Sequence, residues 1–128
     1  MEVRREIPNG PEAAAQARRL LDPFVSRIPQ DVLDDARLVL SELVTNSYKH
    51  AGSPEGTPIH IILRDSQDRL RLEVIDRSIF DPTPETTEEL RSTKWGLLVI
   101  ERVADDWGRI SEGGIWAEFQ LGTPEDGI

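Results

Sequence analysis

The chain has 128 residues, and its 24 acidic residues outnumber its 15 basic ones, which gives a net charge of −9. This length predicts one domain, residues 1–128. The acidic balance argues against a nucleic-acid partner, because contacts to phosphates need clustered Lys and Arg. It also argues against binding to an anionic membrane surface.

The chain contains no cysteine, which excludes disulfides and thiolate zinc sites. No stretch approaches the roughly 18 consecutive apolar residues of a membrane span. The first residues also lack the long apolar stretch of a signal peptide. We therefore expect a cytoplasmic protein.

The first two predicted elements are a strand and a helix. Residues 2–8 predict a short strand, which ends at the turn sequence PNGP. Residues 11–28 have alanines and leucines at helical spacing. Pro23 lacks an amide donor, so we expect this helix to kink or restart there, with Asp22 as a cap.

The strongest helical pattern covers residues 30–51 and is followed by Gly52, a common helix terminator. Its expected apolar stripe consists of Val32, Ala36, Val39, Leu40, Leu43, Val44 and Ser47. Three polar residues, Glu42, Asn46 and His50, are spaced four apart along the edge of that stripe.

The next part of the chain predicts a hairpin, a loop and a helix. Alternating hydrophobic residues over 59–63 and 70–74 predict a β-hairpin with one buried face. A long loop follows over residues 77–93, and loops of this length are usually functional or mobile. An apolar pattern then predicts a helix over residues 97–107, stopped by Gly108.

A second hairpin is predicted over residues 109–121, with its turn at Gly113 and Gly114. Clustered helices together with hairpins predict an α+β fold, a two-layer sandwich, rather than a doubly wound fold. We expect a mixed, mostly antiparallel sheet that is covered by helices on one face.

The polar stripe of Glu42, Asn46 and His50 has two interpretations. One is a solvated helix face, because the outer faces of helices are ordinarily polar. The other is a metal site. Only His50 is a typical transition-metal ligand, so an oxygen-rich Mg²⁺ site completed by substrate phosphates is the more sensible form of that interpretation.

Later motifs also allow a structural or a functional interpretation. The strand LEVI delivers Asp76 at its end, where a carboxylate can cap a loop or accept a hydrogen bond from an exocyclic amine such as that of adenine. Gly96 precedes an apolar helix, where it can form a plain turn or let free N–H groups approach a phosphate. The glycines at 113–114 are explained by a hairpin turn alone.

Taken in order, these motifs resemble the GHKL nucleotide-binding superfamily, which includes ATPase domains of histidine kinases and type II topoisomerases and a class of heat-shock chaperones. The order is ExxxNxxxHA on a helix, a strand followed by Asp, a long loop, Gly-Leu opening a helix, and Gly-Gly with a strand. The compact length and the stretch SELVTNSYKHA are most similar to the bacterial anti-sigma-factor serine/threonine kinases. The resemblance covers about residues 10–122.

The resemblance implies roles for the polar stripe. Glu42 matches the family's catalytic carboxylate, which orients or deprotonates the nucleophile, either water or a partner's serine. Asn46 matches the asparagine that binds Mg²⁺, the metal that bridges the phosphates of ATP. His50 matches the end of this motif, close to the phosphates and the lid.

The resemblance also implies a nucleotide pocket further along the chain. Asp76 matches the aspartate that accepts from the adenine amino group, and Ser78 stands where the family has a glycine. Gly96 and Leu97 match the end of the glycine-rich lid motif. Gly114 matches the final glycine motif, which supports the adenine pocket.

The sequence departs from the family pattern in the lid and in the final motif. Lys94 and Trp95 stand where the family has glycines, and bulky residues restrict the backbone there. Lys94 can instead contact a phosphate as a point charge. Ile115 stands where the family has a threonine.

Two hypotheses follow from the resemblance. The first is an ATP- and Mg²⁺-dependent serine/threonine kinase that phosphorylates a serine of an anti-anti-sigma partner of the STAS type, binds a sigma factor, or does both, and so regulates bacterial transcription. The alternative is a non-catalytic interaction module with weak or no nucleotide binding. Glu42 and Asn46 favour the first hypothesis. Ser78 in place of the family's glycine, the altered lid and the altered final motif favour the second. Relatives commonly form homodimers, so a homodimer is a further expectation.

Overall fold

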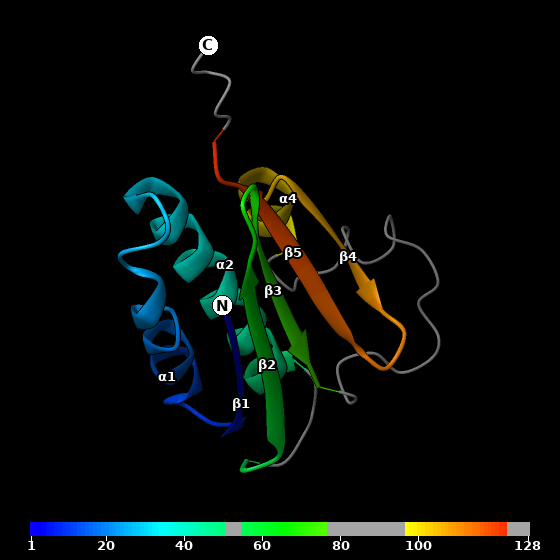
Figure 1. Ribbon diagram of the computed structural model, residues 1–128. Helices are drawn as coiled ribbons and strands as arrows, with labels where there is room; N and C mark the ends of the chain where they lie inside the picture. The colour runs from blue at the N-terminus through cyan, green and yellow to red at the C-terminus, as the bar shows by residue number, and fades with distance from the viewer. Residues whose placement is uncertain (51–54, 77–96, 123–128) are drawn as a thin grey trace.

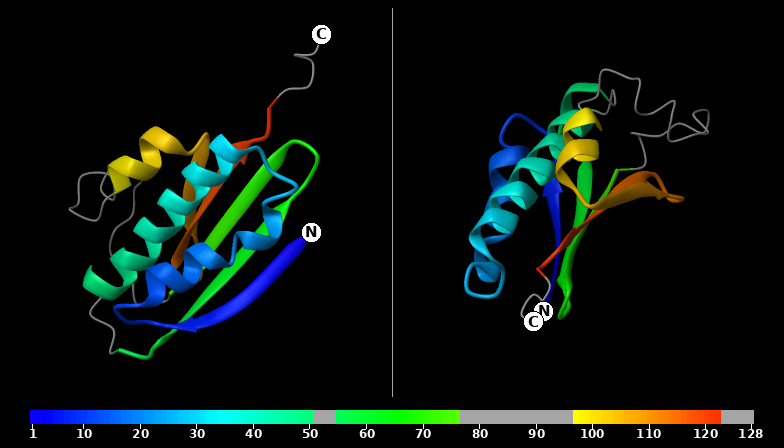
Figure 2. Two further views of the ribbon diagram at one scale, coloured as in Figure 1. Left: turned by 90° about the vertical axis from the view of Figure 1, so that its left-hand side faces the viewer. Right: turned by 90° about the horizontal axis from the view of Figure 1, so that it is seen from above.

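The computed structural model describes residues 1–50, 55–76 and 97–122, with the backbone alone described for residues 46–50 and 97. A five-stranded sheet runs through the molecule, and helices lie along one of its faces (Figures 1 and 2). The strands are β1 (Glu2–Pro8), β2 (Pro58–Asp65), β3 (Arg69–Ile75), β4 (Asp106–Ile110) and β5 (Gly114–Gln120). The helices are α1 (Ala13–Arg19), the 3₁₀ turn η1 (Asp22–Phe24), α2 (Gln30–His50) and α4 (Leu97–Val103).

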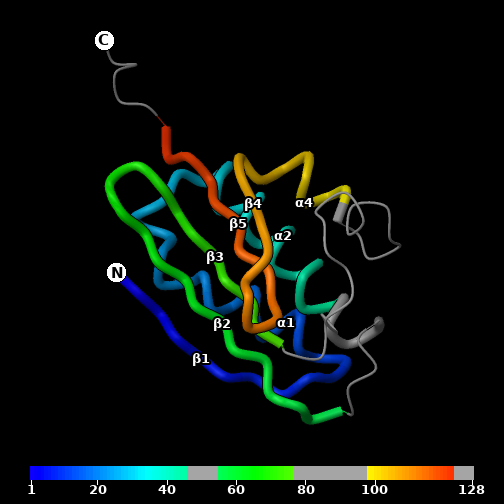
Figure 3. The backbone as a smooth tube through the Cα atoms, turned by 90° about the vertical axis from the view of Figure 1, so that its right-hand side faces the viewer, coloured from blue at the N-terminus to red at the C-terminus, as the bar shows by residue number. Residues whose placement is uncertain are grey.

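The strands are arranged in the order β1-β2-β3-β5-β4, and all four pairings among them are antiparallel. β2 and β3 form the predicted hairpin, with Leu63 opposite Leu72. β5 lies between β3 and β4, which Figure 3 shows from a second side. The predicted α+β two-layer fold, with helices on one face of the sheet, is confirmed.

The hydrophobic core lies between α2 and the helix-covered face of the sheet. One side of α2 is hydrophobic, and alternate residues of β2, β3 and β5 point toward it. The buried residues of α2 are Leu33, Ala36, Val39, Leu40, Leu43 and Val44. Those of the three strands are Ile59, Ile61, Leu63, Leu70, Leu72, Val74, Ile115, Ala117 and Phe119. This packing fixes α2 across the centre of the sheet.

The helix predicted over residues 11–28 is interrupted, and the restart expected at Pro23 is confirmed, although the first helix ends earlier than Pro23. α1 ends at Arg19, and the chain then forms η1, which contains Pro23. In a continuing α-helix the ring of Pro23 would collide with the carbonyl four residues earlier, that of Arg19. Asp22 makes no capping hydrogen bond, so its predicted role as a cap is wrong. Its carboxylate accepts instead from Arg37 of α2.

The helix predicted over residues 97–107 is wrong in its second half. α4 ends at Val103, and the chain continues into β4, so Gly108 is a strand residue and not a helix terminator. The chain leaves the helix where the N–H of Asp105 donates to the carbonyl of Glu118 in β5. Over so short an apolar run, periodicity alone does not separate a helical turn from a strand.

The second hairpin is confirmed, but its turn lies slightly earlier than predicted. β5 begins at Gly114, which is therefore a strand residue. Gly113 alone of the two occupies the turn, with a φ of +103°. Residues with a Cβ rarely adopt such a positive φ, which explains the glycine.

The uncovered face of the sheet carries charged side chains that pair with one another. Arg71 donates to Glu73 at 2.8 Å and to Glu118 at 2.7 Å. Its guanidinium also lies 4.6 Å from the ring centre of Trp116. Burial alone would lower the pKa of Arg71, but the hydrogen bonds to Glu73 and Glu118 more than offset this and raise it. The uncovered face is therefore a network of ion pairs.

Candidate functional site

Asp76, one of the predicted site residues, lies directly after β3. The alternation of Leu72 and Val74 places it on the helix-covered face of the sheet. Of the charged residues that the structure describes, only Asp76 is buried, with 3% of its surface exposed. Its backbone N–H donates to the carbonyl of Gly113 at 2.9 Å. Asp76 is thereby fixed at the point where β3 leaves the sheet.

Gly114 holds the neighbouring strand unusually close to Asp76. A Cβ placed on Gly114 would lie 2.3 Å from the carbonyl oxygen of Val74 and 2.9 Å from the Cα of Ile75. Both are backbone atoms, so no rotamer change could make room. The glycine predicted as part of a nucleotide motif therefore has a clear physical role, because it allows β3 and β5 to meet next to the buried carboxylate. Gly113, which accepts the Asp76 N–H, was predicted only as a turn residue.

Glu42 lies on α2 and is half-buried. α2 packs against β3, β5 and α4, and it runs without interruption through Asn46 to His50. The three residues of the polar stripe therefore share one helix, as predicted, one turn apart from each other. Because the side chains of Asn46 and His50 lie outside the described residues, only the backbone supports their alignment.

The elements that carry the predicted site residues converge in the fold. Figure 1 shows the carboxyl ends of α2 and β3 at the same end of the molecule, where β5 begins. α4 begins at Leu97, as the Gly-Leu motif predicted, and packs against α2. Ser78, Lys94 and Gly96 lie outside the described residues. α2, which carries Glu42, therefore packs against β3 and β5, and Asp76 directly follows β3 where β5 begins at Gly114.

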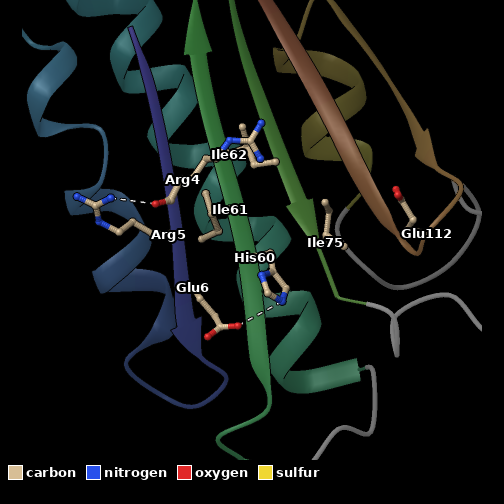
Figure 4. Close-up of a pocket in the computed structure, with 8 residues that line it drawn as sticks. All are labelled: Arg4, Arg5, Glu6, His60, Ile61, Ile62, Ile75 and Glu112. Carbon is tan, nitrogen blue, oxygen red and sulfur yellow. Dashed lines mark hydrogen bonds and ion pairs between the residues drawn. The ribbon is translucent and has the colours of Figure 1, made fainter.

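A cavity of about 520 Å³ lies on the opposite, uncovered face of the sheet (Figure 4). Ile75 lines this cavity. Successive residues of a strand point to opposite faces of the sheet, so Asp76 points away from the cavity. Several of its polar side chains already have partners within the protein: His60 lies 3.4 Å from Glu6, Arg5 donates to the Arg4 carbonyl, and Arg4 pairs with Glu2. None of the predicted site residues that the structure describes lines this cavity.

Two further observations concern metal-ligand groups and membrane-spanning helices. No group of three or more His, Asp or Glu side chains in the described part of the chain is arranged to hold a metal ion. No helix within the described ranges is long and apolar enough to cross a membrane.

The described chain thus forms an α+β domain with helices on one face of an antiparallel sheet and a buried aspartate directly after β3. The family model for the histidine kinase-like ATPase domain matches residues 7–120. The chain therefore belongs to the histidine kinase-like ATPase domain family. A comparison with curated proteins found no match.

The fold is also similar to a solved structure, that of the RsbU and RsbW domains of Rv1364c from Mycobacterium tuberculosis. The TM-score is 0.68 at 18% sequence identity, and the similarity covers 94% of this chain. It covers only 32% of the solved chain, so the present chain corresponds to about a third of that protein. At this identity the similarity establishes the fold alone.

Proposed function

We propose that the protein is an ATP-binding regulator that uses Mg²⁺ and resembles anti-sigma-factor serine/threonine kinases. Membership of the histidine kinase-like ATPase family supports nucleotide binding in general. The observation that carries the proposal is the buried carboxylate of Asp76, held at the end of β3 and beside the close contact between Gly114 and β3. Its fixed position at the strand end, on the helix-covered face, suits a binding function.

In this proposal Asp76 and Gly114 form the base-binding part of the site. The carboxylate of Asp76 accepts a hydrogen bond from the exocyclic amino group of adenine. Gly114 contributes by its missing side chain, since any Cβ there would push β3 and Asp76 out of place. The donor and acceptor types fit an adenine ring, which presents an N–H₂ donor to a carboxylate acceptor.

The polar stripe of α2 forms the catalytic part of the site. Asn46 offers an amide oxygen, the kind of ligand that Mg²⁺ accepts alongside waters and phosphate oxygens. Glu42 orients a partner's serine hydroxyl and accepts its proton. Bound ATP supplies the phosphoryl group, and most of the catalysis in such transfers comes from alignment and charge neutralisation. His50 lies at the end of the stripe, near the expected position of the phosphates.

The partners follow from the same proposal. We propose a serine of a STAS-type anti-anti-sigma protein as the phosphoryl acceptor, and a sigma factor as a second, sequestered partner, so that the protein regulates transcription in the bacterial cytoplasm. The similarity of the fold to a structure that contains an RsbW domain supports this assignment. We also propose a homodimer, which light scattering after gel filtration measures directly.

Calorimetry with a non-hydrolysable ATP analogue tests nucleotide binding. We expect submillimolar binding that requires Mg²⁺, is lost in Asn46→Ala and in Asp76→Ala, and persists in Glu42→Ala. Gln67→Ala is a matched control for Asn46→Ala, because it removes an amide from an exposed position outside the site. Absence of binding at millimolar nucleotide and Mg²⁺ in the unmodified protein would refute the ATP-binding proposal.

Phosphoryl transfer is tested separately with labelled ATP and a candidate anti-anti-sigma protein. We expect label to appear on the partner, and Glu42→Gln to abolish this while analogue binding stays intact. If Glu42→Gln transfers label at the original rate, Glu42 has no catalytic role. This comparison separates a defect in chemistry from a defect in binding.

A second candidate function is a non-catalytic interaction module on the same fold. The observation that favours it is the sequence, in which Ser78 after Asp76 and Lys94 and Trp95 in the lid stand at positions that the family fills with glycine. Such a module would bind a sigma factor equally well with and without nucleotide. Sigma-factor binding that is independent of ATP and unchanged in Asn46→Ala would identify it.

A further inference from the structure

A second charged site lies in the helix layer, where three arginines converge between α1 and α2. Arg18 and Arg19 end α1, and Arg37 faces them from α2. Together with Ala15 and Asp22 they line a cavity of about 230 Å³, which we call the arginine groove. The whole chain has a net charge of −9, so this concentration of positive charge is a local reversal. Figure 2 (left) shows α1 and α2 side by side over the sheet.

The arginines of the groove have donors that the protein does not use. Arg37 donates to Asp22 from Nη2 at 2.9 Å, while its Nε lies buried without an acceptor. Arg18 reaches the hydroxyl of Ser41 at the long distance of 3.3 Å. No hydrogen bond or ion pair joins Arg19 to another described residue. A guanidinium pairs best with both oxygens of a carboxylate or phosphate, and the exposed guanidinium groups of Arg18 and Arg19 offer such donors at the groove.

Asp22 does not neutralise the groove. One hydrogen bond holds it to Arg37, and its side chain is 63% exposed. Exposed pairs of this kind contribute little to stability. An incoming carboxylate can therefore join or displace Asp22 at small cost, and Arg18 and Arg19 remain available in either case.

Two exposed hydrophobic residues lie close in sequence to residues of the groove. Leu38, which follows Arg37, is 45% exposed, and Val25, three residues after Asp22, is 53% exposed. They are two of the four large hydrophobic residues that are this exposed among those described. A small anion makes no use of them, whereas a polypeptide with both acidic and apolar side chains contacts charge and hydrophobic surface together.

We propose that the arginine groove docks an acidic segment of a protein partner. Carboxylates of that segment pair with Arg18, Arg19 and Arg37, the three arginines that line the groove. The groove shares no residue with the Glu42–Asp76 site, so docking requires neither nucleotide nor catalysis. Because the chain as a whole repels acidic peptides, any such binding must originate from a local site.

Fluorescence anisotropy tests the proposal with a short labelled peptide rich in glutamate and leucine. At low ionic strength we expect saturable binding, which weakens as added salt screens the charges. The counterpart peptide with glutamine in place of glutamate should not bind. In the double variant Arg18→Gln/Arg19→Gln we expect affinity to fall roughly fivefold, as the loss of two exposed charge pairs predicts. Circular dichroism verifies that the variant is folded.

The matched control is Arg4→Gln/Arg64→Gln, which removes two exposed arginines from the uncovered face of the sheet. We expect this variant to bind the peptide as the unmodified protein does. An equal loss of affinity in both double variants, or no binding at all, would overturn the proposal. Displacement of the peptide by inorganic phosphate, beyond that caused by chloride at equal ionic strength, would overturn it in favour of a small-anion site.

Discussion

The indole of Trp116 occupies the space that a side chain at position 108 would need. A Cβ built on Gly108 would lie 2.8 Å from Nε1 of Trp116, its cross-strand neighbour, and Arg71 lies over the same ring. We therefore expect Gly108→Ala to displace Trp116 and to lower the free energy of unfolding by about 1–3 kcal/mol, the usual cost of overpacking. Urea denaturation measures this loss.

A double-mutant cycle shows whether the cost arises from the indole. In a Trp116→Ala background the space beside Gly108 is empty, so Gly108→Ala should cost much less there. An equal cost in both backgrounds would mean that the glycine is needed for some other reason than Trp116.

Gly114→Ala tests the close contact between β3 and β5. The added Cβ meets the backbone of Val74 and Ile75, which cannot rotate away, so we expect a loss of roughly 3 kcal/mol in unfolding free energy. Gly10→Ala is the control, because its Cβ would meet only the flexible side chain of Glu55 at 3.4 Å. Comparable stability of the two alanine variants would contradict this account of Gly114.

Asp65 gives the protein a predictable response to acid. Its carboxylate accepts from Nε of Arg27 and from the amino group of Met1, each at 2.8 Å. The hydrogen bond from Arg27 is the main cause that lowers the pKa of Asp65, the amino group lowers it further, and burial opposes both. Since the pKa is lower in the folded state, these contacts stabilise the protein above the unfolded pKa of about 3.9. That stabilisation is lost as the pH falls through the folded pKa.

We expect Asp65→Asn to cost about 1–3 kcal/mol at neutral pH, because two charged donors lose their acceptor. The difference between the variant and the unmodified protein should shrink as the pH falls below about 4. Urea midpoints measured across this range test the claim, with the exposed Glu112→Gln as a control. A difference that stays constant with pH would refute it.

Asn9 is buried with neither its amide nitrogen nor its amide oxygen hydrogen-bonded. Its backbone bonds to Gly56 and Thr57 do not depend on the side chain. We therefore expect Asn9→Leu to leave stability unchanged or to raise it by about 1 kcal/mol, since an unpaired buried amide is unfavourable. Asn9→Asp should be strongly destabilising at neutral pH, because it buries an unpaired charge. A clear loss of stability in Asn9→Leu would show that the amide has a bonding partner, such as a bound water molecule.

The sequence predicted best the elements whose pattern is long and regular. The helix at residues 30–51 and the hairpin of β2 and β3 are found where periodicity placed them, because both bury a continuous hydrophobic face. The position of Asp76 followed from the same alternation. The end of the helix that begins at Leu97 could not be predicted, since Gly108 has the position of a helix terminator. Its role as a strand residue next to Trp116 depends on the strand pairing.

Features that depend on distant parts of the chain could not be predicted. The pairing of Asp22 with Arg37 joins two elements 15 residues apart, and local sequence predicted a cap instead. The closeness of Gly114 to Val74 requires knowledge of which strands are neighbours. The roles of Glu42 and Asn46 came from the family resemblance, and they stay predictions until the binding experiments are done.

The strand order leaves β1 and β4 at the two edges of the sheet, and both edges are poorly suited to fibril growth. An unpaired strand edge can recruit a strand from another molecule. β1 carries Glu2, Arg4 and Glu6 and ends at Pro8, which has no N–H to donate. β4 is only five residues long and begins with Asp106. An approaching edge strand of a second molecule therefore encounters charged side chains and an incomplete set of backbone hydrogen-bonding groups. We expect the sheet to resist amyloid-like extension at high protein concentration.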